Sequence, residues 1–370
     1  MWQAASMLTK SPRISRRATM RVLLGGTVAA LCVGLSTACR TAGPSTPTAP
    51  AATAAPIPVR AASLRTFAEA GQYIAADRGY FAEEGLDVTL SEMSARTVLT
   101  ALIDRELDVG GSSIGAAIFS TVAQGVQVRI VAPEARMEPG SSSLFTLVNN
   151  DLIDAGQFRD YADLAGKRIV GSAGSTSQYF FWRALQRVGL SPDSVNMLDL
   201  GQDFQTVVAA LGNHAVDVAT VPEPIATMAA ERGLATKWRE VSDLLPGLQV
   251  TVVVFGPDLV TSRPEVGRRW MTAYLRGVRD YTDAIFKRGP HRDDVVAILA
   301  KWTGITDPSL YGKMGFPNLD PNGHINLDSV ADQLSFHREQ GNVPAAVELA
   351  QVVDTRIAEA AVQELGLYRL

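Results

Sequence analysis

A run of small and hydroxyl-bearing residues between positions 171 and 177 has the composition of an anion-binding loop. It follows the predicted strand Arg168–Gly171 and leads into the predicted helix Ser177–Val188. The first backbone N–H groups of a helix have no partner inside the helix, and they lie at the positive end of its dipole. These groups, together with the hydroxyls of the loop, suit a compact oxyanion such as a sulfonate or carboxylate; the hydroxyls belong to Ser172, Ser175, Thr176 and Ser177. A P-loop is excluded because its lysine is missing, and a helix cap that binds nothing stays open as the alternative.

A second cluster, Gly111-Ser112-Ser113-Ile114-Gly115, also lies between a predicted strand and a predicted helix. It matches the G-x-S-x-G pattern in which hydrolases hold a nucleophilic serine. A secreted serine hydrolase that uses Ser113 is therefore one hypothesis, since four histidines are present that could act as its base: His214, His291, His324 and His337. So short a pattern of small residues is common by chance, and we favour a second helix start that faces a ligand.

Glu223 stands between two prolines, directly after the predicted strand Val216–Val221. A carboxylate at this place could meet a cationic or hydrogen-bonding group of a ligand, or it could complement the dipole of the next helix. We expect no metal site and no cofactor, because the histidines lack the spacing of metal ligands. Both cysteines, Cys32 and Cys39, precede residue 40, so the rest of the chain has neither a disulfide nor a thiol nucleophile.

The charge of the chain is distributed unevenly. The formal net charge is −4, but residues 1–38 carry five basic residues and no acidic one, which leaves −9 on residues 39–370. An acidic body without a basic stripe is a poor candidate for binding nucleic acid. It also has no general attraction to anionic membrane surfaces.

Residues 1–38 have the features of a lipoprotein signal peptide. A basic segment precedes the apolar run Val22–Leu35, which is shorter than the roughly 20 residues that a membrane span needs. Cys39 follows Ser-Thr-Ala as in a bacterial lipobox, so we expect it to be acylated. An ordinary secretory signal, twin-arginine export through Arg16-Arg17, and a start at Met20 remain alternatives. Residues 39–58, rich in Ala, Thr and Pro, are predicted to form a disordered tether.

From Val59 onward, short apolar runs alternate with helical segments, a pattern typical of an α/β fold with parallel-rich sheets. Two strand-rich blocks are followed, after Pro264, by a helical C-terminal tail. We therefore predict two lobes joined by two crossings, with the tail packed on the first lobe. The predicted lobes comprise residues 59–146 with 254–370, and residues 147–253; the crossings are expected near Leu144–Asn149 and Gln249–Pro257.

Five segments of the body, in this order and spacing, resemble a known family of substrate-binding proteins. That family includes sulfonate-, taurine- and nitrate-binding proteins and thiamine-precursor binders. The segments that carry the resemblance are Ile74–Val88, Leu102–Gly110, Asp163–Gly171, Ala210–Glu223 and Arg263–Val266. The likeness extends roughly from Val59 to Lys301.

The resemblance implies a type II periplasmic-binding fold that closes around a small-molecule ligand by a hinge motion. It also implies a monomeric, lipid-anchored, extracytoplasmic receptor for an ABC transporter permease; a ligand-sensing module without a transporter is the alternative. A sulfonate-like oxyanion is favoured, and a pyrimidine or an aromatic acid is possible. Enzymes of this family depend on cysteines, so no enzyme activity is expected. By position, the ligand contacts would be Phe67, Glu69, Gln72, Ser112, Ser113, Ser141, Ser172, Ser175, Thr176, Ser177 and Glu223.

Overall fold

The computed structural model describes residues 55–140, 143–201 and 203–369. The predicted signal peptide, Cys39 and most of the predicted tether lie outside the described residues. The prediction of disorder is wrong for the last two residues of that tether, because strand β1 already begins at Ile57. No helix in the described ranges is both long and apolar enough to cross a membrane.

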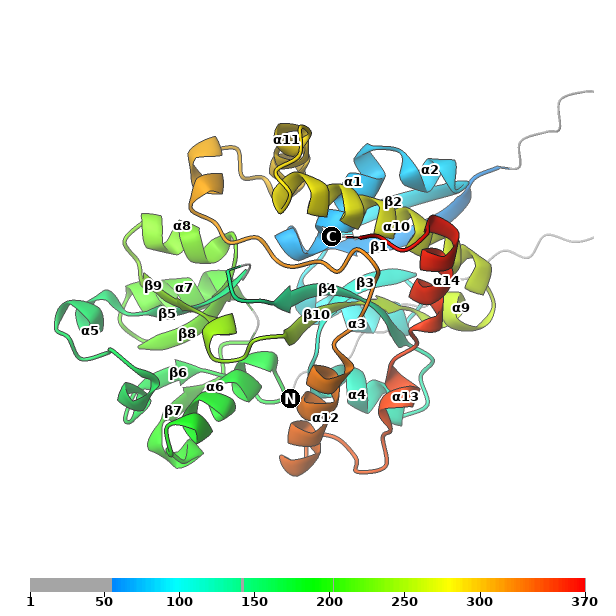
Figure 1. The fold of residues 1–370 in the computed structure, drawn as a ribbon. Coiled ribbons are helices and arrows are strands. Elements are labelled where there is room, and N and C mark those ends of the chain that lie inside the picture. Colours follow the sequence, from blue (N-terminus) through cyan, green and yellow to red (C-terminus); the bar gives the residue numbers. More distant parts are fainter. Residues whose placement is uncertain (1–54, 141–142, 202, 370) are drawn as a thin grey trace, which may run out of the picture. The chain divides into compact units, whose positions relative to one another are not determined.

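The first sheet contains five strands in the order β2-β1-β3-β10-β4 (Figure 1). Their bounds are β1 (Ile57–Ser63), β2 (Leu86–Glu92), β3 (Val109–Ser113), β4 (Arg129–Met137) and β10 (Leu248–Phe255). β1 runs parallel to β2 and to β3, whereas β10 runs antiparallel to β3 and to β4. Most residues of β4 and β10 are buried on both faces, which fits the apolar runs Ile130–Pro133 and Val252–Phe255 within them.

The second sheet repeats this arrangement with the order β7-β6-β8-β5-β9. Its strands are β5 (Leu144–Val148), β6 (Arg168–Val170), β7 (Asn196–Leu198), β8 (Val218–Pro222) and β9 (Thr236–Glu240). β6 pairs in parallel with β7 and β8, and β5 is antiparallel to β8 and β9. In both sheets the fourth position is thus taken by the strand that directly follows a passage of the chain from the other sheet, β10 in the first and β5 in the second.

The places where the chain passes between the sheets differ from the expectation. Both segments predicted as crossings form strands, β5 in the second sheet and β10 in the first, so the predicted boundaries at 146 and 254 fall inside strands. The chain instead leaves the first sheet after β4 ends at Met137, and it leaves the second sheet after β9 ends at Glu240. These two strands are apolar and buried like any central strand, so composition could not separate a crossing from a core strand.

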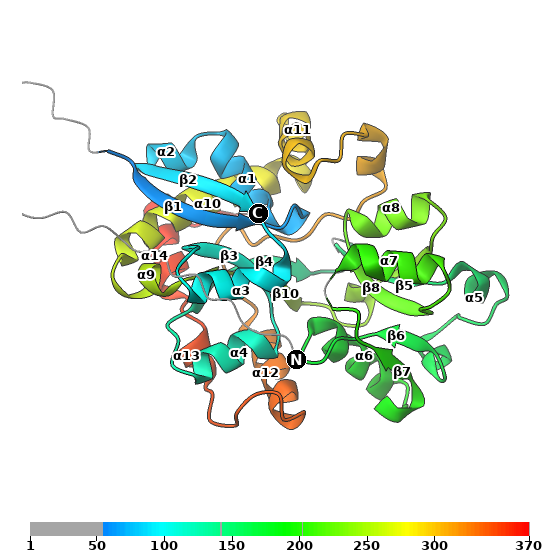
Figure 2. The ribbon, with the colours of Figure 1, turned by 180° about the vertical axis from the view of Figure 1, so that it is seen from behind.

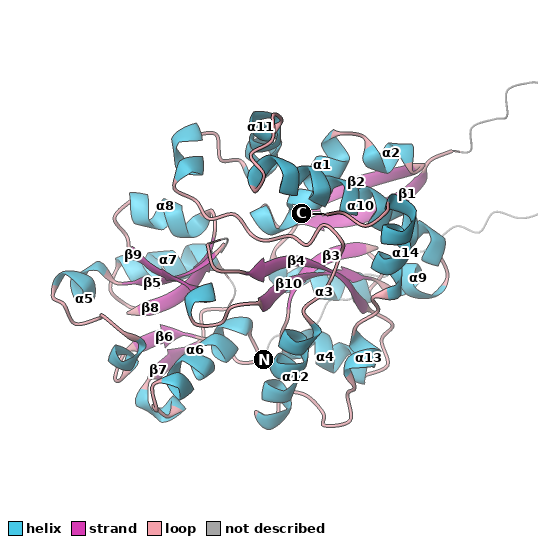
Figure 3. Cartoon of the chain, viewed as in Figure 1, coloured by secondary structure: helices cyan, strands magenta, loops and turns pink. Residues whose placement is uncertain are grey.

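Helices cover both faces of each sheet (Figures 2 and 3). With the first sheet are a 3-10 turn η1 (Phe67–Glu69), α1 (Ala70–Asp77), α2 (Tyr80–Glu83), α3 (Ala95–Ile103) and α4 (Ala116–Ala123). With the second are α5 (Asn150–Asp154), α6 (Thr176–Arg187), α7 (Phe204–Gly212) and α8 (Ile225–Glu231), besides the 3-10 turns η2 (Tyr161–Leu164), η3 (Pro192–Ser194) and η4 (Val241–Asp243). The single helix predicted over 71–84 is divided into α1 and α2, because Gly79 between them is left-handed with φ of 76°.

The C-terminal tail is helical, as predicted. It contains α9 (Pro257–Thr261), α10 (Pro264–Ile285), α11 (Arg292–Thr303), η5 (Pro308–Gly312), α12 (Leu327–Glu339), α13 (Leu349–Val352) and α14 (Arg356–Leu365). α10 packs closely on α1, since a Cβ at Gly277 would come within 2.1 Å of the Gly71 carbonyl oxygen. α12 reaches beyond the first sheet: its Asp332 pairs with Tyr179 and Arg183 of α6.

Candidate functional site

A cleft of about 320 Å³ lies where strand ends and helix starts of the two sheets face each other. Its walls are mainly apolar; the first sheet and its loops supply Leu64, Met93, Met137 and Val250, and the second supplies Leu144, Phe204 and Ile225. Polar groups interrupt these walls at Thr66, Ser94, Arg96, Ser113, Glu134, Ser143, Asp203, Glu223 and Thr251. Apolar walls with few polar groups are typical of a pocket for a small organic molecule.

A recess of about 50 Å³ adjoins the cleft and shares Ser113, Leu144, Phe204 and Val250 with it. Hydroxyl-bearing residues dominate the polar part of its wall: Ser113, Ser172, Ser175, Thr176, Ser177 and Thr220. The structure thus brings five of the predicted site residues together around one small space. Ser112 lines a neighbouring pocket of about 330 Å³ that shares Ser113 and Ser172 with the recess, and its hydroxyl donates to the Ser113 carbonyl oxygen at 3.1 Å.

The hydroxyls at the start of α6 are already engaged with protein groups. Thr176 donates to the carbonyl oxygen of Ile114 at 2.8 Å, and Ser177 shares a 2.8 Å hydrogen bond with Thr220. Ser175 caps the helix by accepting from the backbone N–H of Gln178, so the alternative of a helix cap is realised at this residue. The donors that suit an anion here are therefore the first backbone N–H groups of α6, which no helical carbonyl can satisfy.

Ser172 is held by an acidic neighbour. Its hydroxyl donates to Asp199 at 2.5 Å and lies 3.2 Å from the Gly201 carbonyl oxygen. This hydrogen bond, together with the Gly201 N–H, holds the pKa of the Asp199 carboxyl below its ordinary value. Ser141, the remaining serine of the predicted set, lies outside the described residues. Ser143 beside it is buried and lines the cleft.

The loop after β3 and the loop after β6 meet directly beside the recess. The backbone N–H of Ala116 donates to the Gly174 carbonyl oxygen at 2.9 Å, next to the bond between Thr176 and Ile114. A Cβ at Gly115 would lie 2.6 Å from that same oxygen. We call these contacts of Ile114, Gly115 and Ala116 with Gly174 and Thr176 the seam; they join the two sheets in a closed arrangement around the cleft.

Glu223 lies at the cleft, but its carboxylate is fully engaged. It is 1 % exposed and accepts hydrogen bonds from the N–H and the hydroxyl of Thr227, from Lys237 at 2.8 Å, and from the Gly315 N–H. Thr227 belongs to α8, so Glu223 supports the start of that helix, as the dipole interpretation predicts. A ligand would have to compete with the ammonium of Lys237 for this carboxylate.

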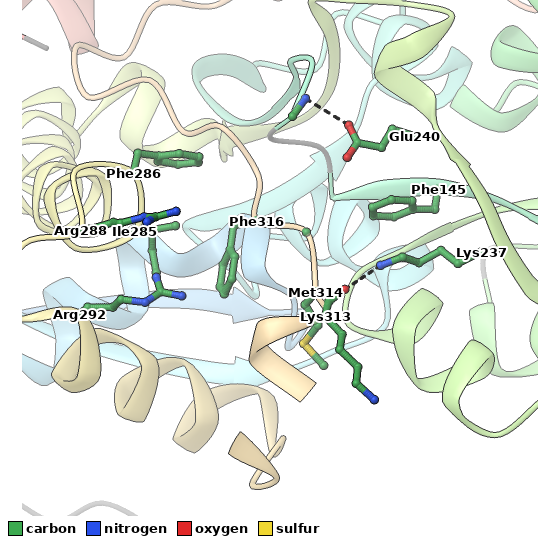
Figure 4. A pocket seen from close by; sticks show the side chains of 12 residues that line it. Phe145, Lys237, Glu240, Ile285, Phe286, Arg288, Arg292, Lys313, Met314 and Phe316 are labelled. Atoms are coloured by element: carbon green, nitrogen blue, oxygen red, sulfur yellow. Dashed lines mark hydrogen bonds between the residues drawn. The ribbon is translucent and has the colours of Figure 1, made fainter. Parts of the chain in front are cut away.

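Lys237 separates the cleft from a second, open hollow of about 670 Å³ (Figure 4). This hollow is basic: Lys237 and Lys313 lie on its wall with Arg288 and Arg292, and Glu240 is the one acidic residue among its described lining residues. In Figure 4, Phe316 lies between the two arginines and the side of Phe145 and Lys237. None of the hydroxyl-bearing helix starts reaches this hollow. The smaller cleft is therefore the candidate site.

Three residues that were expected at the site are buried behind it instead. Phe67 is 0 % exposed and stacks on Phe316 with ring centroids 5.3 Å apart. Glu69 accepts hydrogen bonds from Tyr73, from Gln72 and from the Leu64 N–H. None of Phe67, Glu69 and Gln72 lines the cleft or the recess in the described structure. The reason is local: η1 turns Phe67 and Glu69 into the core, and Gln72 follows on the buried part of α1.

Glu134 is a cleft residue that the sequence analysis missed. It lies on β4, is 4 % exposed, and lines the cleft. Burial, together with the nearby charge of Glu69, raises the pKa of Glu134 well above its ordinary value. Burial likewise raises the pKa of Glu69, to about 7. An acidic residue in the otherwise apolar run Val131–Ala135 was the signal that could have identified it.

Ser113 has no catalytic partners in the described structure. No described hydrogen bond joins it to a histidine. The one buried histidine among the described residues, His337, packs against Phe119 and Phe336, and burial lowers its pKa to about 4. A nucleophilic serine needs a base within hydrogen-bonding reach, and the geometry here does not supply one.

Comparison with known proteins decides the family. The model of the NMT1/THI5 like family matches residues 66–284. The chain belongs to this family. It is 25% identical over 312 residues to the taurine-binding periplasmic protein of Escherichia coli (strain K12), a match that covers 80% of this chain and 92% of that protein.

Solved structures agree in fold with this member of the NMT1/THI5-like family. The periplasmic aliphatic sulphonate binding protein from Escherichia coli superposes with a TM-score of 0.63 at 18% identity, covering 82% of this chain and 99% of that one. The desulfurization enzyme DSZB superposes with a TM-score of 0.59 at 16% identity, covering 84% and 99%. The predicted type II periplasmic-binding fold, with its two sheets and helical tail, is confirmed.

Proposed function

We propose that the protein is the extracytoplasmic substrate-binding component of an ABC importer and captures a small organic solute in the 320 Å³ cleft. The observation that carries this proposal is the seam, where loops of the two sheets touch across a cleft that both sheets line. A solute that contacts both halves stabilises the closed form by its differential affinity. An importer can then distinguish the loaded receptor from the empty one.

A sulfonate-like head group is the proposed anionic part of the solute. The recess beside the cleft is small and rich in hydroxyl groups, and it faces the start of the twelve-residue helix α6, where an anion is favoured. The names of the taurine-binding relative and of the sulphonate-binding neighbour support the same chemistry. Ser112, Ser113, Ser141, Ser172, Ser175, Thr176, Ser177 and Glu223 stay proposed ligand contacts, whereas Phe67, Glu69 and Gln72 are proposed only to support the cleft.

A thermal-shift screen followed by calorimetry tests this function. Sulfonates, pyrimidines, aromatic carboxylates and nitrate are added to the purified body, and a true ligand raises the melting temperature in proportion to its occupancy. Small-angle scattering with and without the best compound then reports closure. The absence of any stabilising compound in the panel would contradict a receptor function.

Membrane attachment through Cys39 is part of the proposal and is tested separately. Acylation of Cys39 would place the folded body outside the cytoplasmic membrane beside its permease, as a monomer on a tether. The full chain should partition with membranes and incorporate a labelled fatty acid. Cys39→Ser should release it as a soluble exported protein, and equal membrane retention of both forms would contradict the anchor.

Binding without chemical conversion is favoured over a hydrolase. The lack of a histidine bonded to Ser113 in the described structure supports this view, as does the absence of cysteine beyond residue 39. Incubation of the wild type and of Ser113→Ala with a panel of esters should give no turnover above the uncatalysed rate. Turnover that disappears in Ser113→Ala would establish the hydrolase instead.

A further inference from the structure

Glu134 is a buried carboxyl group without a cationic partner among the described residues. Its two oxygens lie against β3, where a Cβ at Gly111 would come within 2.8 and 2.9 Å of them. The hydroxyl of Thr251 on β10 is near enough to favour the charged form of Glu134, but it makes no well-aligned hydrogen bond. Gly111 therefore leaves the space that this carboxyl group fills, and no cationic side chain in the described ranges pairs with it.

The other acidic groups near the cleft have protein partners for their oxygens. Glu223 is paired with Lys237, and Glu69 is hydrogen-bonded by Tyr73 and Gln72. Asp203 caps the start of α7 by accepting from the Gln205 N–H. Glu134 alone among these acidic groups faces the cleft with acceptor capacity unused.

The cations of this region do not compensate Glu134. Arg96, which also lines the cleft, is exposed and acts on Asp199 and Asp203. A Cβ at Gly201 would lie 1.8 Å from its guanidinium, so this group lies against the loop after β7. The nearest charge that acts on Glu134 is instead that of Glu69, which is negative.

This arrangement selects the chemistry of the solute. Burial disfavours the charged form of Glu134. A cation that arrives with a ligand stabilises that charged form, so the carboxyl group releases its proton to the solvent on binding. The negative charge of Glu69 behind Glu134 disfavours a second anion at this end of the cleft. A protonated amine can instead donate to both carboxylate oxygens.

We infer that the solute of this cleft carries a protonated amine or a similar nitrogen donor, which binds to Glu134, and an anionic head that lies in the recess. The inference rests on the proposed receptor function. It narrows the ligand class from organic oxyanions in general to amino-substituted ones.

Matched pairs of compounds test the inference. Each pair differs by one amino group: taurine and ethanesulfonate, β-alanine and propionate, 4-(aminomethyl)benzoate and 4-methylbenzoate. Dissociation constants are measured by calorimetry for the wild type, for Glu134→Gln and for Asp87→Asn. Asp87 is an exposed acidic residue on β2 of the same sheet and provides the matched control.

The wild type should bind the amino member of at least one pair about tenfold more tightly. Glu134→Gln should lose this preference and keep its affinity for the partner that lacks the amine, whereas Asp87→Asn should keep the preference. Glu134→Asp, which retains the carboxyl group, should keep the preference for the amino member of the pair at lower affinity. This variant replaces Glu134→Gln in the test if the glutamine variant is unstable.

Two results would overturn the inference while the receptor function stands. One is equal or tighter binding of the members without an amine, and the other is a preference that survives in Glu134→Gln. If the wild type binds none of these compounds and none of the wider screen, the receptor function itself fails. The two failures are thereby distinguished.

Discussion

Thr176 at the start of α6 donates a hydrogen bond to the carbonyl oxygen of Ile114, 2.8 Å away in the loop after β3. The two residues follow strands of different sheets, and both are buried. Under the proposed hinge closure, this contact forms as the two halves close, so its strength enters the equilibrium between open and closed forms. Variants of the seam therefore report on closure.

Thr176→Val should weaken ligand binding without unfolding the protein. The change keeps the shape of the side chain but leaves the Ile114 carbonyl without its donor, which costs about 1 kcal/mol or slightly more. Calorimetry with a ligand from the screen should therefore show roughly fivefold weaker binding. Thr282→Val is the control, because the buried Thr282 hydroxyl donates to the Val278 carbonyl oxygen within its own helix α10, outside the lining of the cleft and the recess; equal losses of affinity in both variants would contradict a role in closure.

Gly115→Ala should keep the two halves apart. Gly115 has an extended backbone with φ of −157°, so alanine fits its conformation. The added Cβ, however, would lie 2.6 Å from the Gly174 carbonyl oxygen. We expect binding to weaken by about tenfold or more, with scattering that stays open at saturating ligand. Gly312→Ala, where a Cβ has nothing within 4 Å, should behave as the wild type; closure of Gly115→Ala at wild-type affinity would disprove the seam.

Lys237→Met should destabilise the fold, since it leaves the buried Glu223 carboxylate without its cation. Loss of one partner of a buried pair costs roughly 3 kcal/mol, measured as the free energy of unfolding in urea. The double variant Lys237→Met with Glu223→Gln should recover part of that loss. Lys313→Met removes an exposed pair with Glu231 instead and should change stability little. A similar loss of unfolding free energy in Lys237→Met and Lys313→Met would show that the burial of Glu223 does not set the contribution of its ion pair to stability.

The stability of the body should fall as the pH rises from about 4.5 to about 7. Burial raises the pKa of Glu69 from 4.5 to about 7, so the folded protein keeps a proton that the unfolded chain has already released. This stabilisation is complete below the unfolded-state pKa of 4.5 and is lost as the pH passes the folded-state pKa of about 7. The free energy of unfolding changes by an amount on the order of 3 kcal/mol. Glu134, which faces Glu69, changes stability in the same direction.

Urea titrations at several pH values test this dependence. Glu69→Gln should flatten the decrease, whereas Glu359→Gln, an exposed residue of α14, should leave it unchanged. An identical pH profile in wild type and Glu69→Gln would assign the dependence to other groups.

The loops around the site could be predicted because they follow from short-range patterns. An apolar strand, a run of small residues and a helix recur at Ser113 and at Thr176, and parallel strands bring such loops to one edge of a sheet. The partner of Thr176 could not be predicted, because the Ile114 carbonyl oxygen comes from the other sheet. That bond depends on how two separately formed sheets dock.

Side-chain direction limited the rest of the prediction. Phe67, Glu69 and Gln72 follow β1 as expected, but the 3-10 turn η1 directs Phe67 and Glu69 into the core, and Gln72 is buried in α1. Glu134 was missed for the opposite reason: β4 is buried on both faces, and alternation along such a strand does not indicate which side faces a cavity. Its charge within an apolar run was a better guide than its position in the pattern.

The place of β10 in the first sheet has a consequence for the order of strand pairing. β4 pairs with the rest of that sheet through β10, which follows every strand of the second sheet in the sequence. The second sheet comes from a contiguous stretch, residues 144–240, so its strands can pair without residues from the rest of the chain. The first sheet cannot pair β4 until β10 has joined it, so a chain shortened before residue 248 would leave β4 without its partner strand.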